Sequence, residues 1–202
     1  MWTWLSSYAA QISAIADVAM VLIWLTYLHV FVISYLRSNR TAIHIGMVTG
    51  ARADARCVIA NVGSAPVYLL GVAADMDCAG TIQPVLLTDR LELQDQDLAD
   101  PRQRTTQGTL GPGEARDIGS FRDLVDRAAI RLGHDLPFDG CEAMTLTAVV
   151  ATREASSSLQ GGFKRFGIAW EDGQAIFSSP DLLTRQIRSG RRRRRLRKVL
   201  TE

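Results

Sequence analysis

The first 36 residues contain no Lys or Arg and only one acidic residue, Asp17. From Val18 to Leu36 the sequence holds 19 residues without Asp, Glu, Lys or Arg. At about 1.5 Å of rise per residue, an α-helix over this run spans roughly 28 Å, close to the hydrocarbon thickness of a bilayer. The missing charge therefore predicts a single transmembrane helix, with the following domain held at a membrane surface.

Familiar catalytic motifs are also missing. The sequence contains no GxSxG, no HExxH, no Walker loop and no dinucleotide fingerprint. His134, Asp135 and Glu142 lie near one another in the sequence, but a His beside acidic residues in a loop is common by chance. We therefore expect a protein that is not an enzyme and that holds no cofactor or metal ion.

Cysteine is scarce: the sequence contains only Cys57, Cys78 and Cys141. The number is odd, the spacing is wide, and no CxxC or Cys/His cluster occurs. This pattern predicts neither a disulfide framework nor a zinc site. We expect buried or unused thiols in a reducing compartment.

The first positive side chains, Arg37 and Arg40, follow directly after the apolar run. By the positive-inside rule they place the C-terminal domain in the cytoplasm and the N-terminus outside a bacterial inner membrane. Residues 1–10 carry no Lys or Arg, and the apolar run is longer than that of a signal peptide. The segment is therefore predicted to be a retained single-pass anchor.

Several side chains of this helix are candidates for contact with a partner helix. Ala9 and Ser13 have small-xxx-small spacing, which lets two helices approach closely. Asp17 is either an interfacial residue or a polar contact inside the membrane. An aromatic stripe faces lipid or a protein neighbour. The full candidate set is Ala9, Ser13, Asp17, Trp24, Tyr27 and Phe31.

We divide the chain into an anchor (1–37), a β-domain (38–180) and a basic tail (181–202). Alternating or apolar runs separated by turn residues predict the strands of the β-domain. One helix is predicted to begin at Ser120, with Asp123 in its first turn, and to end at Gly133. The predicted strands are 42–48, 56–62, 67–74, 81–88, 141–153, 163–170 and 174–178.

Residues 56–72, RCVIANVGSAPVYLLGV, carry one resemblance. An apolar strand, Asn-x-Gly, a small turn, then Pro and another apolar strand resemble the strand–turn–strand of immunoglobulin-like β-sandwiches. The positions that match are Val58, Ile59, Asn61, Gly63, Pro66, Val67 and Tyr68. The resemblance implies a mainly-β, immunoglobulin-like sandwich with one peripheral helix, and a binding or scaffolding module.

Residues 185–202 hold nine Lys or Arg against Glu202 alone, whereas residues 1–184 are mildly acidic. Residues 181–188 are predicted to form a short amphipathic helix. The tail can contact anionic lipid headgroups, an acidic protein surface or a nucleic acid, and its apolar Leu196 and Leu200 favour the first two. The candidate contact residues are Arg37, Arg40, Arg191, Arg192, Arg193, Arg194, Arg195, Arg197 and Lys198.

These features predict a non-catalytic accessory or scaffold subunit of an inner-membrane complex. Its expected partners are other membrane protein subunits and anionic lipid headgroups; a homo-oligomer is left open, and nucleic acid is not favoured. The alternative is a membrane-anchored sensor or effector whose β-domain binds a ligand.

Overall fold

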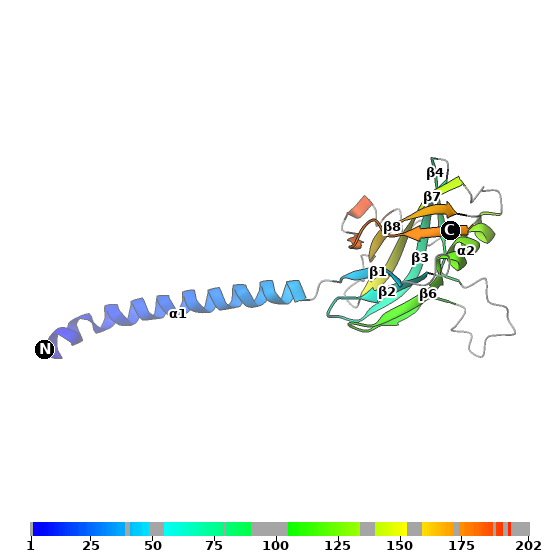
Figure 1. The fold of residues 1–202 in the computed structure, drawn as a ribbon. Coiled ribbons are helices and arrows are strands. Elements are labelled where there is room, and N and C mark those ends of the chain that lie inside the picture. Colours follow the sequence, from blue (N-terminus) through cyan, green and yellow to red (C-terminus); the bar gives the residue numbers. More distant parts are fainter. Residues whose placement is uncertain are drawn as a thin grey trace. The chain divides into compact units, whose positions relative to one another are not determined.

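A computed structural model describes residues 2–38, 41–48, 55–78, 80–89, 105–133, 140–152, 159–171, 174–187, 189–191 and 194. The chain separates into two compact units, Met1–Arg40 and Thr41–Glu202. The first unit contains one long helix, α1 (Trp2–Ser38), and the second is rich in β-strands (Figure 1). A mostly-β chain with an N-terminal apolar helix agrees with the coarse prediction of the fold.

The β-domain contains two antiparallel sheets. The smaller sheet has the order β1-β2-β6, with β1 (Ile43–Val48), β2 (Arg56–Asn61) and β6 (Ala115–Ser120). The larger sheet has the order β10-β8-β7-β3-β4, so β10 and β4 lie at opposite edges. Its strands are β3 (Val67–Cys78), β4 (Thr81–Leu86), β7 (Cys141–Thr152), β8 (Gln160–Glu171) and β10 (Arg185–Gln186). In addition, β5 (Gly108–Leu110) pairs with β3, and β9 (Gln174–Ser178) pairs with β8.

Both sheets contribute to one hydrophobic core. Alternate residues of β1, Ile43 and Ile45, are buried in the same cluster as Leu69 of β3 and Leu146 of β7. Burial of these apolar side chains is the main favourable term in folding. The arrangement is compatible with a sandwich of two sheets.

Asn61 ties the end of β2 to two turns. Its side-chain amide donates to the carbonyl oxygens of Ala65 (2.8 Å) and Leu110 (3.1 Å), and its Oδ1 accepts from the backbone N–H of Gly63 (3.0 Å). The side chain is fully buried, and these bonds satisfy it. The Asn-x-Gly turn predicted from the sequence is thus a hydrogen-bonded junction.

The soluble helix α2 (Phe121–Leu132) has the predicted caps. Ser120 Oγ accepts from Asp123 N–H, and Asp123 Oδ2 accepts from Ser120 N–H, which together form a capping box. Gly133 ends the helix in the left-handed conformation (φ 78°). Phe121 packs on Phe166 and Phe177 of the larger sheet, with ring centroids 4.7 Å and 4.9 Å away.

One local prediction is wrong. Residues 185–186 form β10 instead of part of a helix, because the backbone of this segment pairs with Phe163 and Gly162 of β8. Arg127 of α2 is also fully buried, so its long aliphatic stem lies in the interior beside the apolar residues of the helix.

Candidate functional site

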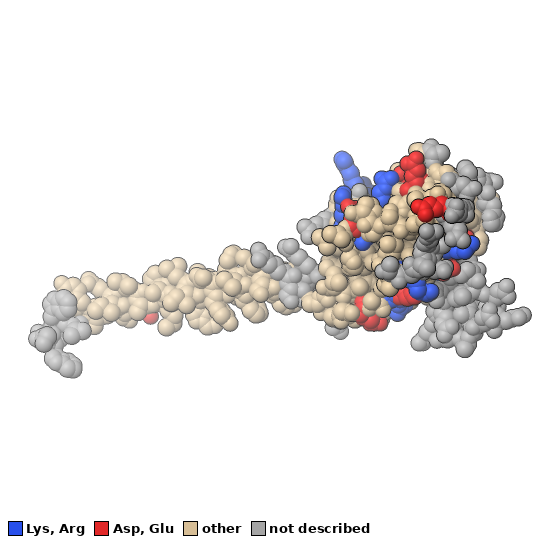
Figure 2. All heavy atoms as spheres, viewed as in Figure 1, with Lys and Arg blue, Asp and Glu red and all other residues tan. Residues whose placement is uncertain are grey.

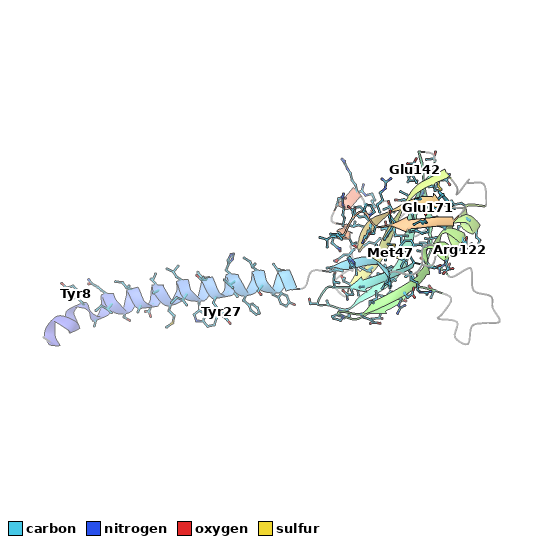
Figure 3. The ribbon with its side chains drawn as sticks, in the orientation of Figure 1. Tyr8, Tyr27, Met47, Arg122, Glu142 and Glu171 are labelled. Atoms are coloured by element: carbon cyan, nitrogen blue, oxygen red, sulfur yellow. A yellow bond between two sulfur atoms is a disulfide. The ribbon has the colours of Figure 1, made fainter. Side chains whose placement is uncertain are left out.

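The six candidate residues of α1 share one face of the helix. At about 100° per residue, positions 9, 13, 17, 24, 27 and 31 fall within an arc of roughly 80°. All six side chains are exposed within their unit. Tyr27 projects outward from the helix (Figure 3), and the rings of Phe31 and Tyr35 stack at 6.3 Å. The small residues, the carboxylate and the aromatic residues thus form a continuous stripe that can contact another helix.

The apolar span of α1 is longer than the run predicted from the missing charges. It extends from Gln11 to Leu36, 26 residues, and all of their side chains are exposed within the structure. Figure 2 shows a single acidic side chain on the otherwise uncharged described part of this helix, and that residue is Asp17. Asp17 lies six residues inside the span, about 9 Å along the helix axis. Because about 20 residues cross the hydrocarbon core, a span of 26 residues places Asp17 either at the boundary of the core or inside it.

The described part of the tail shows two of the candidate basic residues. Arg191 and Arg194 are both exposed. Arg37 lies in the last turns of α1, and the structure describes its backbone only. The remaining candidates, Arg40, Arg192, Arg193, Arg195, Arg197 and Lys198, lie outside the described residues.

Two polar side chains connect the segment before the tail to β1. Gln186 Oε1 accepts from the N–H of Ile43 (3.1 Å), and Gln186 Nε2 donates to the carbonyl of the same residue (2.7 Å). Thr184 Oγ1 accepts from the N–H of Ile45 (2.7 Å). These side chains pair with the outer edge of β1 as a neighbouring strand would. We call Thr184 and Gln186 the β1 clamp.

Glycine at position 162 makes room for the clamp. A Cβ atom there would lie 2.7 Å from Thr184 Cγ2 and 3.2 Å from the carbonyl oxygen of Ile43. The need for glycine at position 162 could not be predicted from the sequence. Gly161 and Gly162 end a Ser- and Gly-rich stretch, residues 156–162, whose composition is typical of a turn. The clamp could not be predicted from the sequence either, because the side chains that bond to β1 lie more than 130 residues away from it in the chain.

Beside the clamp lies a buried cation. Lys164 is 5% exposed; its Nζ donates to the carbonyl of Leu182 (3.5 Å) and lies 5.5 Å from the centre of the Phe166 ring. His44 of β1 lies 3.5 Å from Thr184 Oγ1 through its Nδ1. Burial, and then the positive charge of Lys164, lower the pKa of His44. A neutral His44 is therefore favoured in the folded domain.

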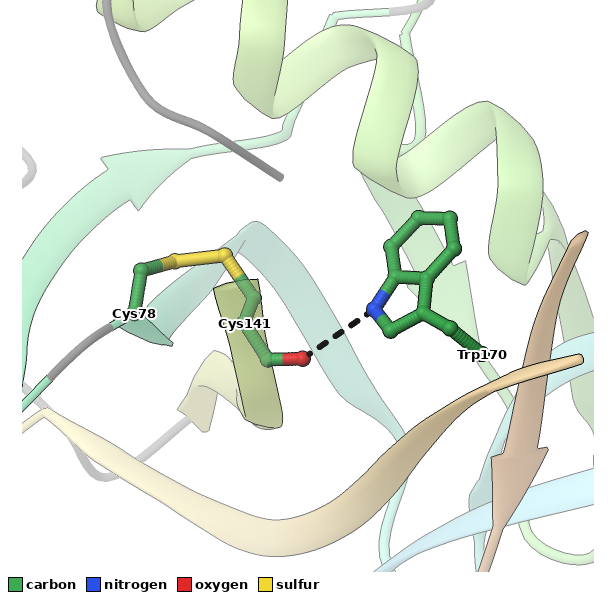
Figure 4. The surroundings of a disulfide bond; sticks show 3 residues. All are labelled: Cys78, Cys141 and Trp170. Atoms are coloured by element: carbon green, nitrogen blue, oxygen red, sulfur yellow. Dashed lines mark hydrogen bonds between the residues drawn. A yellow bond between two sulfur atoms is a disulfide. The ribbon is translucent and has the colours of Figure 1, made fainter. Parts of the chain in front are cut away.

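The cysteine prediction needs correction. Cys78 and Cys141 form a disulfide that joins the end of β3 to the start of β7 (Figure 4). The two residues are 63 apart in sequence but directly opposite each other in the β3–β7 register, so sequence spacing could not reveal the pair. Trp170 Nε1 donates to the carbonyl of Cys141 (3.4 Å). Cys57 is the free cysteine; it is buried, and burial raises the pKa of its thiol.

Among the described residues, no group of three or more His, Cys, Asp or Glu could hold a metal ion. Glu142 is exposed, while His134 and Asp135 lie outside the described residues. The arrangement offers contact surfaces: the helix stripe, the β1 clamp and the basic residues beyond it.

Comparisons with protein-family models, with curated proteins and with solved structures gave no match for this chain.

Proposed function

We propose that this protein is a non-catalytic accessory or scaffold subunit of a bacterial inner-membrane complex. It docks through α1 and through its β-domain, and its partners are other membrane protein subunits and anionic lipid headgroups. The observation that carries the proposal is Asp17 inside the apolar span, on the same face as the small residues and the aromatic stripe. A carboxyl group within a bilayer is energetically costly unless a polar or charged group bonds to it. A helix of a partner subunit can supply that group to Asp17.

We further propose that the span places the β-domain in the cytoplasm. Arg37 and Arg40 after the span, against no Lys or Arg before it, support this orientation. The Cys78–Cys141 disulfide opposes it, because disulfides are rare in reducing compartments. Both sulfur-bearing residues are buried, which limits the access of reductants.

An immunoglobulin-like sandwich is our proposal for the topology of the domain. Its support is the antiparallel pairing within two sheets and the buried Asn61 at the turn between β2 and β3. This class of fold hosts many binding modules, so it is consistent with a scaffold role without specifying a partner.

The test of the proposed function is extraction of the full chain in mild detergent, native separation and mass spectrometry of the proteins that travel with it. We expect stoichiometric membrane partners. Replacing Asp17 with Leu should leave the protein in the membrane fraction after alkaline extraction but weaken partner retention about tenfold, which corresponds to about 1.4 kcal/mol.

Thr26→Leu is the matched control for this variant. It also removes a polar side chain from the span, but Thr26 lies on the opposite side of the helix and bonds the carbonyl of Leu22 (2.8 Å). Partner retention should be unchanged. A wild-type protein that migrates as a lone monomer or homo-oligomer would contradict the subunit proposal and favour a ligand-binding sensor.

A further inference from the structure

Leu182 and Leu183 are the most exposed large apolar side chains of the described chain. They are 86% and 77% exposed, more than any large apolar side chain described in α1, of which Ile15 is the most exposed at 70%. Elsewhere on the β-domain, large exposed apolar residues such as Ile82 and Ile130 occur singly along strands and helices. Scattered single residues of this kind are ordinary, whereas two adjacent leucines on a loop tip require an explanation.

The loop that carries these leucines is held in place. Ser179 Oγ donates to the carbonyl of Asp181 (2.9 Å), and Lys164 Nζ donates to that of Leu182 (3.5 Å). Immediately after the leucines, the β1 clamp fixes the chain to the edge of β1. The two apolar side chains are therefore presented from an anchored loop on the domain surface.

The clamp places this loop beside the part of the domain that follows α1 in the chain. Gln186 contacts Ile43, which is only five residues beyond Ser38, the end of α1. Five residues of extended chain span at most about 18 Å. Figure 1 shows the start of β1 and the segment around residues 180–187 on the same side of the domain. The chain between the end of α1 and the residue that the clamp holds is therefore at most about 18 Å long.

Positive charge accompanies the leucines. Arg185, Arg191 and Arg194 are exposed, and Arg185 pairs only loosely with Asp181 (3.8 Å between Nη2 and Oδ2). The sequence continues with further basic residues up to Lys198. Apolar side chains flanked by Lys or Arg match the interface of an anionic bilayer, where the apolar groups enter the acyl boundary and the cations contact headgroups.

We propose that Leu182 and Leu183 insert into the interfacial region of the anionic leaflet at which α1 ends. The exposed Arg185, Arg191 and Arg194 contact its headgroups. The loop thereby provides a second membrane contact that fixes the β-domain against the bilayer. This inference rests on the proposed transmembrane span of α1 and adds a lipid-binding site to it.

The experiment uses the full chain with Leu182→Cys, labelled with an environment-sensitive fluorophore. The native cysteines do not interfere, because Cys57 is buried and Cys78 is bonded to Cys141. The labelled protein is reconstituted into vesicles of phosphatidylcholine mixed with phosphatidylglycerol, with or without a lipid that carries a shallow spin-label quencher. We expect a blue-shifted emission that loses most of its intensity to the quencher.

Ile82→Cys provides the matched control. Ile82 is 58% exposed on β4, and β4 lies at the opposite edge of the larger sheet from β10. A label there should keep an aqueous emission and escape the quencher. Quenching at residue 182 no greater than at residue 82 would overturn the proposal. A shift at residue 182 that requires a co-purified protein, and not the quencher lipid, would also overturn it.

Two further readouts separate the parts of the argument. In vesicles of phosphatidylcholine alone, insertion should weaken severalfold; equal quenching in both vesicles would overturn the role of the basic residues. Alkaline extraction of the same samples reports the span itself. Chain that resists extraction with an unquenched loop overturns only the loop inference, whereas chain released by alkali overturns the span on which the proposed function depends.

Discussion

His44 shows how one residue makes the stability of the domain depend on pH. Burial and the nearby Lys164 lower its pKa below the ordinary value of 6.5. The folded state thus binds a proton less readily than the unfolded chain. This contribution to stability is present in full above the unfolded pKa and is lost as the pH falls below it.

We therefore expect the free energy of unfolding to decrease between about pH 7.5 and about pH 5, with part of the decrease due to His44. The variant His44→Gln removes the titrating group and should flatten the curve over this range. Urea denaturation of the full chain in mild detergent, followed by circular dichroism, measures it. An identical pH slope in the wild type and in the variant would contradict this role of His44.

Single residues also show which features the sequence could predict and which it could not. Ser120, Asp123 and Gly133 predicted the ends of α2 because helix caps depend on local chemistry. Asn61 predicted its turn for the same reason. The Cys78–Cys141 pair could not be predicted, because it depends on the register of two strands that are far apart in the sequence.

At the scale of elements, the strands with apolar runs were predicted within about four residues of their observed bounds, whereas β5, β6 and β10 were not among the predicted strands. A two-residue strand carries no periodicity, and residues 181–188 have a helical pattern of apolar positions. Tertiary contacts override that pattern, because pairing with β8 and the β1 clamp satisfies backbone groups at an otherwise open edge. Because residues 181–188 were predicted to be an amphipathic helix, the exposure of Leu182 and Leu183 on a loop was not predicted.

The β1 clamp leads to a prediction about this element. Gln186→Ala leaves the N–H and C=O of Ile43 without their side-chain partners, at a site that is partly buried. We expect the free energy of unfolding to decrease by about 2 kcal/mol. Gln107→Ala, at an exposed position, is the matched control and should change it by less than about 0.5 kcal/mol. Equal effects of the two variants in urea denaturation would refute the clamp.

At the scale of the whole molecule, the charge distribution and the disulfide point to opposite sides of a membrane. Arg37, Arg40 and the basic tail favour a cytoplasmic domain. The Cys78–Cys141 bond is typical of an oxidising compartment. The native cysteines cannot decide between them by labelling, because one is buried and the other two are bonded to each other.

Two engineered cysteines can decide the orientation. Ile130→Cys places a thiol on α2, where Ile130 is exposed, and Tyr8→Cys places one before the apolar span. With a maleimide that cannot cross membranes, we expect intact cells to show labelling at residue 8 and not at residue 130, and permeabilised cells to show both. Labelling at residue 130 alone in intact cells would reverse the orientation and place the β-domain, with its disulfide, in the oxidising compartment outside the cytoplasm.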